Sequence, residues 1–163
     1  MRPTFVRFLC RRVSETVSLV DLLPTFAELA SVPVPENQPV DGSSILPVLT
    51  GGDFDAERSM FFHFPLYLGG GGAGRVLPSF DGEENYWRAV PLSVIMKGDW
   101  KLIKYYEYDS YELFNLKEDI SEENELSEVE KEKAEELLLE LKAWTKETNA
   151  PIPSVLNTSI NTQ

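Results

Sequence analysis

The chain has 163 residues, of which 42% are hydrophobic and 26% charged, and its formal net charge is −12. This composition is typical of a globular protein that buries one core or part of a larger one. The negative charge argues against nucleic acid or an anionic membrane as a partner, because both require a basic protein surface. A single cysteine, Cys10, excludes an intrachain disulfide.

The N-terminal segment MRPTFVRFLCRR combines positive charge with apolar residues, as a signal peptide does. Arg7 interrupts the apolar run, however, and no small-residue cleavage site follows, so a signal peptide is not predicted. We predict instead a buried strand at residues 4–9, beside which Cys10 is a packing residue. No transmembrane helix is predicted, because no apolar run approaches the roughly twenty residues that a bilayer requires.

Residues 18–30 carry apolar side chains at the spacing of an amphipathic helix. The helix is predicted to begin near Asp21, because Pro24 is tolerated only within the first turn. The prolines of the following VPVPENQP segment end it. A short second helix should follow, capped by Ser43 or Ser44 and stopped by a pair of glycines.

A short aromatic strand is predicted at residues 58–64, and it ends at a proline. The segment 66–88 has four successive glycines and little periodicity, which is typical of a functional or irregular loop. Its G-x-G-x-x-G spacing does not indicate a dinucleotide site, because Pro78 intervenes and no helix follows. His63 lies at the strand end before this loop, so both a packed imidazole and a ligand-contacting one remain open.

Residues 91–116 predict a three-stranded antiparallel meander. Apolar and polar side chains alternate on either side of Gly98-Asp99, a pair that suits a type II′ turn because Gly98 has no Cβ. Ser127 and Glu130 have the spacing of a capping box, which predicts a helix over residues 127–146 whose apolar stripe covers the sheet. The predicted fold class is therefore α+β, a small antiparallel sheet packed by a long C-terminal helix.

The residues alone predict no catalytic group and no metal site. A hydrolytic site needs a nucleophile, a base and a group that stabilises developing charge. Cys10 and His63 are the sole residues of their types, and the acidic residues are spread along an exposed helix and its approach.

Four segments in order resemble the C-terminal portion of the sulfatases of the alkaline-phosphatase-like superfamily: VSLVDLLPTFAELASVPVPENQPVDGSSILPVLTGG, RSMFFHFP, GDWKLI and YELFNLKEDISEENEL. The likeness is greatest to the polysaccharide- and glycosaminoglycan-type sulfatases and covers nearly the whole chain. It implies that residues 1–55 are the C-terminal remnant of a catalytic α/β domain. Residues 56–150 would be the C-terminal subdomain, and residues 151–163 a tail.

Members of this family hydrolyse sulfate esters with a formylglycine, made in a C/S-x-P-x-R motif, and a calcium ion. Cys10 is followed by Arg-Arg-Val and does not match that motif. The resemblance therefore implies that this chain has no cofactor of its own, is inactive alone, and supplies a wall of the substrate cleft. His63, Arg75 and Arg88 would lie nearest a sulfated compound, because the guanidinium fork suits sulfate. Loop solubility is the alternative role for both arginines.

The leading hypothesis is a C-terminal fragment of a sulfuric ester hydrolase, arylsulfatase-like or acting on sulfated carbohydrate. The alternative is a stand-alone, non-catalytic interaction or carbohydrate-recognition module derived from such a subdomain. A homo-oligomer is also predicted if the apolar face of the helix at 18–30 has no other cover. Members of the family it resembles are usually exported (periplasmic, extracellular or lysosomal), but no signal peptide is predicted here, so the sequence does not indicate a location.

Overall fold

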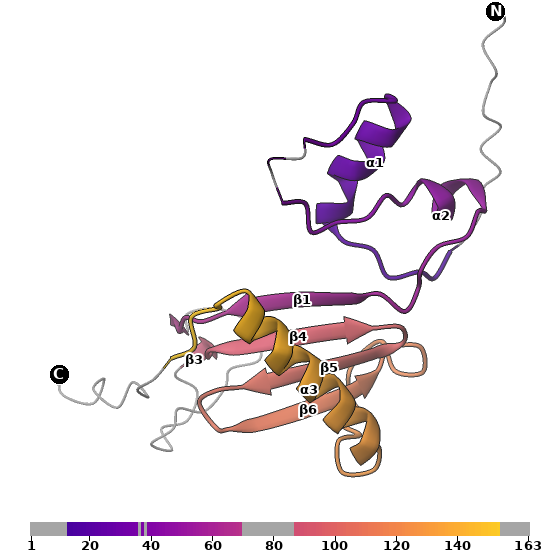
Figure 1. Ribbon diagram of the computed structural model, residues 1–163. Coiled ribbons are helices and arrows are strands. Elements are labelled where there is room, and N and C mark those ends of the chain that lie inside the picture. Colours follow the sequence, from indigo (N-terminus) through magenta and orange to yellow (C-terminus); the bar gives the residue numbers. More distant parts are fainter. Residues whose placement is uncertain (1–12, 36, 38, 70–86, 154–163) are drawn as a thin grey trace, which may run out of the picture. The chain divides into compact units, whose positions relative to one another are not determined.

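The computed structural model describes residues 13–35, 37, 39–69 and 87–153 (Figure 1). It divides into two compact units, Met1–Glu57 and Arg58–Gln163. The predicted strand at residues 4–9 and Cys10 lie outside the described residues.

The first unit is organised around Asp21, whose side chain is completely buried. The 3-10 turn η1 (Leu19–Asp21) leads into α1 (Leu22–Leu29). The Asp21 carboxylate accepts hydrogen bonds from the amides of Ser18, at 2.7 Å, and Ser43, at 2.9 Å. Thr25 donates its hydroxyl to the Asp21 carbonyl at 2.6 Å and accepts from the Ile45 amide at 2.9 Å. These bonds tie the segment before the second helix to the start of α1.

Both helices predicted for this unit are confirmed. α1 begins directly after Asp21 and places Pro24 in its first turn, where the missing N–H breaks no helical hydrogen bond. The second helix, α2 (Leu46–Thr50), has Ile45 at its N-cap rather than the predicted Ser43 or Ser44, although the Ser44 hydroxyl oxygen accepts from the Leu46 amide at 3.2 Å. Gly51 ends α2 with a φ of 82°, a left-handed conformation that glycine adopts without a Cβ clash.

The second unit is built on a four-stranded antiparallel sheet in the order β1-β4-β5-β6. Its strands are β1 (Ser59–Phe64), β4 (Leu92–Lys97), β5 (Trp100–Tyr105) and β6 (Ser110–Asn115). The predicted meander and the strand before it are thus confirmed. Lys97 pairs with Trp100 across Gly98, and the φ of 56° at Gly98 fits the first central position of a type II′ turn.

The helix α3 (Lys131–Glu147) lies across one face of this sheet (Figure 1). The core between them consists of Ile95, Leu102, Leu113, Ala134, Leu137 and Leu141. A second cluster, on the opposite face of the sheet, contains Val90, Ile103, Tyr105 and Phe114. The predicted α+β fold is therefore confirmed. None of the helices within the described ranges has the length and apolar character that a membrane span needs.

The capping box predicted at Ser127 is wrong, because α3 begins at Lys131. Ser127 instead donates its amide to the Glu125 carboxylate at 2.6 Å, and the same carboxylate accepts from the Leu113 amide of β6 at 3.0 Å. Burial raises the pKa of Glu125, but hydrogen bonds from Ser127 and from the Leu113 amide lower it by more, so the net shift is downward. The neighbouring carboxylate thus holds Ser127 in the turn that precedes the helix.

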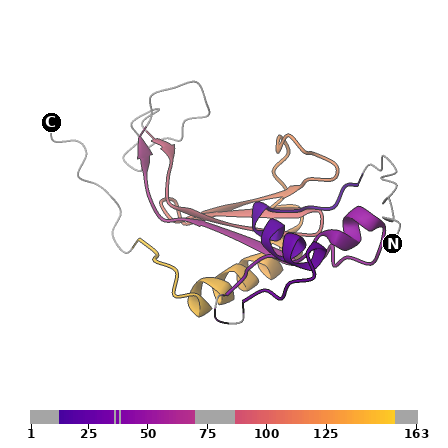
Figure 2. The ribbon, with the colours of Figure 1, turned by 90° about the horizontal axis from the view of Figure 1, so that it is seen from above.

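The segment predicted as one loop at residues 66–88 contains two short strands. β2 (Leu68–Gly69) and β3 (Trp87–Ala89) pair antiparallel, with Leu68 opposite Ala89. Figure 2 shows this pair extending from one end of the larger sheet, on the side away from α3. The sequence does not predict this pairing, because strands of this length show no alternation of apolar and polar residues. Residues 70–86 lie outside the described residues.

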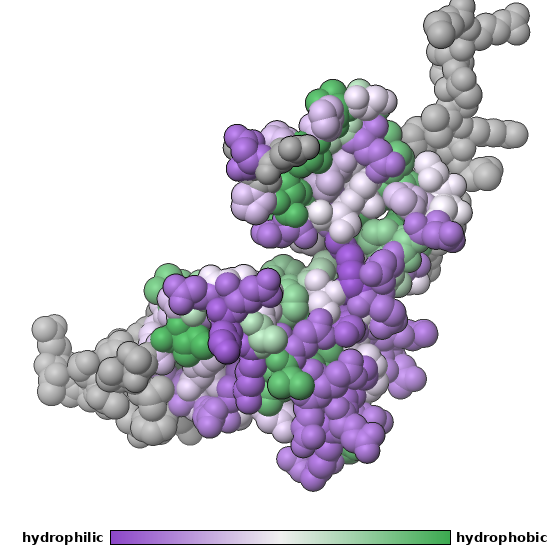
Figure 3. Space-filling view, viewed as in Figure 1, coloured by the Kyte–Doolittle hydropathy of each residue, from purple (hydrophilic) through white to green (hydrophobic). Residues whose placement is uncertain are grey.

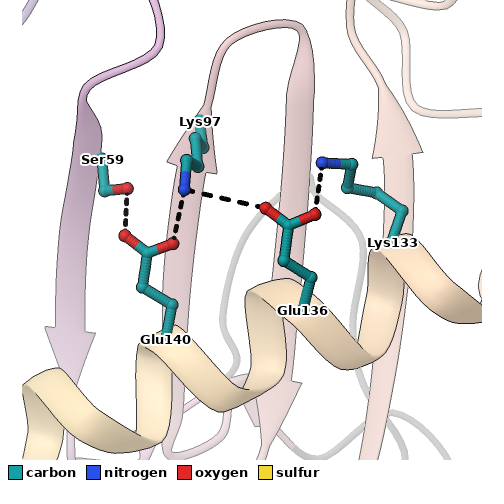
Figure 4. A network of polar contacts seen from close by, with 5 residues as sticks. All are labelled: Ser59, Lys97, Lys133, Glu136 and Glu140. Carbon is teal, nitrogen blue, oxygen red and sulfur yellow. Dashed lines mark hydrogen bonds and ion pairs between the residues drawn. The ribbon is translucent and has the colours of Figure 1, made fainter.

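A chain of polar contacts joins α3 to the sheet (Figure 4). Lys97 of β4 contacts Glu140 at 2.8 Å and Glu136 at 3.7 Å, and Lys133 contacts Glu136 at 2.6 Å. The Ser59 hydroxyl of β1 donates to Glu140 as well. Burial raises the pKa of Glu140, but hydrogen bonds from Lys97 and Ser59 outweigh it and the net shift is downward. The hydrogen bond to Glu140 raises the pKa of Lys97.

These shifts fix the sign of the pH dependence. Glu140 contributes stability above the ordinary glutamate pKa of 4.5 and loses it as the pH falls through its lower folded value. Lys97 contributes stability below its ordinary pKa of 10.5 and loses that contribution as the pH rises through its higher folded pKa.

Glu140→Gln should therefore lower the free energy of unfolding by roughly 0.5 to 1 kcal/mol at neutral pH, as the loss of a partly exposed ion pair does, and leave it unchanged in strong acid. Urea unfolding at several pH values measures it. An equal cost at all pH values would contradict the assignment.

The close packing around Gly42 leads to a prediction about the stability of the first unit. A Cβ added at Gly42 would lie 2.1 Å from the Val20 carbonyl oxygen, whereas one at Gly52 would meet Pro47 at an ordinary 3.5 Å. Gly42→Ala should destabilise the first unit by about 1 to 3 kcal/mol, the cost of overpacking, and Gly52→Ala is the matched control. Amide hydrogen exchange of α1 measures it. Equal exchange rates in the two variants would show that the backbone at Gly42 relaxes freely.

Candidate functional site

The candidate site lies at the end of the sheet where β1 finishes and β4 begins. His63 of β1 pairs with Ser93 of β4, and Phe61 pairs with Ile95 two residues further along. Because side chains alternate across a strand, His63 and Ser93 share the sheet face of Ile95, which α3 covers. Register alone therefore brings the imidazole and this hydroxyl together.

His63 uses both of its ring nitrogens. Nδ1 lies 2.7 Å from the hydroxyl oxygen of Ser93, which in turn lies 2.8 Å from the hydroxyl oxygen of Tyr106. Nε2 lies 3.0 Å from the carbonyl oxygen of Pro151, which follows α3. Ser93 is completely buried, whereas His63 is half-buried. The ring thus connects a buried polar pair to an acceptor at the surface.

Aromatic rings surround this imidazole. Tyr106 lies edge-on at a centroid distance of 6.2 Å, and Trp144 of α3 lies edge-on at 6.4 Å. Trp144 also stacks on Phe61 with centroids 4.8 Å apart and an angle of 4° between the rings. The aromatic contacts fix the plane of the imidazole, and the hydrogen bonds fix its rotation in that plane.

The two predicted arginines are placed only in part. Arg75 lies outside the described residues, and Arg88 is the central residue of β3. The backbone of Arg88 therefore lies at the same end of the sheet as His63, but on the strand pair that extends away from α3 (Figure 2). The structure brings His63 together with Ser93, Tyr106 and Pro151 on the helix side.

A second polar group lies on the sheet face opposite α3. The Tyr67 hydroxyl donates to the carboxylate of Glu107, a residue that is only 4% exposed. On the same face the Tyr105 hydroxyl donates to Glu112 at 2.9 Å. Burial, and then the charge of Glu107, raises the pKa of Tyr108 beside this cluster. Phenol donors thus hydrogen-bond to the carboxylates of Glu107 and Glu112.

The described residues do not fit the calcium ion of the sulfatases. A calcium cage needs several carboxylate and carbonyl oxygens from converging segments. Within the described part of the chain, no three His, Cys, Asp or Glu side chains gather closely enough to hold a metal ion.

The sequence indicates His63 as a candidate but not the residues that hold it. Ser93, Tyr106 and Pro151 lie 30, 43 and 88 positions from His63 in the chain. One signal was available, because Ser93 is a polar residue on the strand face that carries Ile95. A buried hydroxyl needs a hydrogen-bond partner, and the aligned position on β1 supplies it.

Comparison with known proteins places this chain in a family. No model of a protein family matches the chain. A protein named sulfatase from Formosa agariphila is 32% identical to it over 152 residues, which is 85% of this chain and 24% of that protein. The chain thus spans about a quarter of the length of this relative.

Two solved structures share the fold. Ps i-CgsB, crystallised in complex with k-i-k-neocarrahexaose, has a TM-score of 0.58 and 25% identity, over 81% of this chain and 25% of that one. BT4656, in complex with its substrate D-glucosamine-2-N,6-O-disulfate, has a TM-score of 0.52 and 26% identity, over 80% of this chain and 24% of that one.

The chain is thus an α+β portion of a larger class of proteins. That class is the sulfatases, and this chain is related to their C-terminal portion. The resemblance drawn from the sequence is confirmed.

Proposed function

We propose that this chain is the C-terminal part of a sulfuric ester hydrolase, arylsulfatase-like or acting on sulfated carbohydrate, in which it forms one wall of the substrate cleft. The observation that carries this proposal is its 32% identity over 152 residues with the Formosa agariphila sulfatase. Since that match spans 24% of the relative, the formylglycine and calcium ion would belong to the remaining part of such a protein.

A sulfated carbohydrate is the substrate class that the structural likenesses favour. BT4656 was solved with a disulfated glucosamine and Ps i-CgsB with a neocarrahexaose. On the proposed wall, His63, Arg75 and Arg88 lie nearest the sulfated group. An imidazole N–H and two guanidinium groups are donors to an anionic oxygen, and they suit a chain whose net charge of −12 would otherwise repel sulfate.

A chimera tests this function. We expect that this chain, placed in the Formosa agariphila sulfatase in exchange for the aligned portion, supports hydrolysis, whereas this chain alone gives no turnover. The assays are release of 4-nitrophenol from 4-nitrophenyl sulfate and release of inorganic sulfate from sulfated oligosaccharides. The control is the same chimera with its formylglycine-forming residue changed to alanine.

The outcomes of this test are distinct. Turnover by the isolated chain would contradict the assignment of the chemistry to another part of the protein. A chimera that melts cooperatively but hydrolyses no sulfate ester would instead favour the stand-alone, non-catalytic module.

The first unit supports the same proposal through its surface. Figure 3 shows hydrophobic, green areas on this unit. Several apolar side chains of α1 and its flanks are at least half exposed: Leu19, Val20, Leu23, Phe26, Leu29 and Val32. We name these six residues the α1 face. A contiguous apolar patch usually has a partner. In the whole protein, the remainder of the sulfatase would cover the α1 face. In the isolated chain, a second copy would cover it.

This face gives a further prediction. The isolated chain should scatter light as a species larger than the 18.4 kDa monomer, and Phe26→Glu should shift it to the monomer because a buried charge opposes association. Leu139→Glu is the matched control, since Leu139 is 72% exposed but lies on α3. Size-exclusion chromatography with light scattering measures both. A monomeric wild-type chain would show that no second copy covers the α1 face.

A further inference from the structure

The hydrogen bonds of His63 determine where its proton lies. The Pro151 carbonyl oxygen, 3.0 Å from Nε2, can only accept a hydrogen bond, so Nε2 must carry the hydrogen. In the neutral ring Nδ1 is then the acceptor, and the Ser93 hydroxyl, 2.7 Å away, donates to it. Tyr106 completes the chain by donating to the Ser93 oxygen at 2.8 Å. The partners therefore select one tautomer of the imidazole.

The inner end of this chain is held firmly. Ser93 is completely buried in β4, between strands that pair with it on both sides. The Tyr106 amide donates to the carbonyl of Pro91 at 3.0 Å, which anchors the tyrosine backbone to the start of β4. Because Ser93 lies in β4 and Tyr106 directly follows β5, their hydroxyls present a fixed reference to Nδ1.

The outer end is held much less firmly. Pro151 and Ile152 are exposed, and neither Pro151 nor Pro153 has an amide hydrogen to donate. The backbone turns sharply just before them, at Asn149, where φ is 50°. The Ala150 amide, which donates to Thr145 at 2.9 Å, is the last described backbone donor of the helix end. The carbonyl oxygen that accepts from Nε2 thus belongs to an exposed segment beyond the last described backbone donor of the helix end.

We propose that Ser93 and Tyr106 are positioning residues for His63, holding its Nε2–H toward the surface as the donor for an anionic oxygen of the substrate. This inference rests on the proposed sulfatase function for its ligand, but not for its geometry. In the structure the Pro151 carbonyl takes the place of that oxygen. A sulfate ester presents acceptor oxygens of the same kind with more negative charge, so it makes the stronger hydrogen bond.

The tautomer is directly measurable, because His63 is the sole histidine of the chain. Long-range proton–nitrogen correlation spectra in alkaline buffer should show a protonated, pyrrole-like Nε2 and an unprotonated, pyridine-like Nδ1. Ser93→Ala should remove this preference and give signals averaged between the two tautomers, and Tyr106→Phe should give a smaller change in the same direction. A purely structural role for the two hydroxyls would not move these signals.

Two conservative variants serve as controls. Ser110→Ala removes an exposed hydroxyl from β6, and Tyr111→Phe removes a phenol hydroxyl from the same strand. Both should leave the His63 signals unchanged. Thermal melting of each variant reports whether the fold is kept, and the Tyr106→Phe spectrum decides the matter if Ser93→Ala does not fold. A wild-type spectrum with hydrogen on Nδ1, or unchanged signals in folded Ser93→Ala, would overturn the proposal.

The same variants in the chimera test the role of the donor. Ser93→Ala should raise KM for a sulfated oligosaccharide roughly tenfold with little change in kcat, the loss expected for one hydrogen bond to a charged group. His63→Gln should retain more of kcat/KM than His63→Asn, because the glutamine amide reaches the position of Nε2. The reverse order would overturn the donor assignment. An inactive chimera would count against the sulfatase function alone, since the spectra decide the positioning independently.

Discussion

The packing of α3 on the sheet is the constraint on which the second unit depends. Leu137 and Leu141 lie fully buried against the sheet core, and each such leucine stabilises the fold by about 1.5 to 3 kcal/mol. This burial also fixes the register of β1 and β4, because a slip of one residue would turn every core side chain to the other face. His63 and Ser93 meet only in the observed register. The geometry of the candidate site is thus a consequence of the core.

Two clusters of polar side chains lie on opposite faces of the sheet and have different roles. On the helix side, Ser93 and Tyr106 hold the imidazole of His63, and Trp144 of α3 closes over it. On the other side, the buried carboxylate of Glu107 is matched by a phenol. The strand pair β2 and β3 leaves the same sheet end and carries Arg88. A wall built on strands in this way holds its side chains more rigidly than an isolated loop would, which suits the cleft wall that we propose for this chain.

Local signals predicted most of the elements but not all of their boundaries. Alternation in β4 and β5 and the glycine between them predicted the hairpin, because a two-residue turn links residues that are neighbours in the chain. The start of α3 was misplaced because Ser127 has a competing acceptor in Glu125, whose position depends on β6. The pairing of β2 with β3 was missed because such short strands carry no periodicity. Each error arose where a partner lies outside the local window.

Periodicity, turn residues and segment order were enough to predict the α+β class, the meander and the likeness to the C-terminal portion of sulfatases. The residues left both a packed and a ligand-contacting imidazole open for His63. The surroundings of that histidine became known from the folded chain alone, because Ser93, Tyr106 and Pro151 come from three separate segments. The proton position on its ring follows from those partners. Hydrogen bonds between residues far apart in the chain have no characteristic sequence spacing, so the sequence does not predict them.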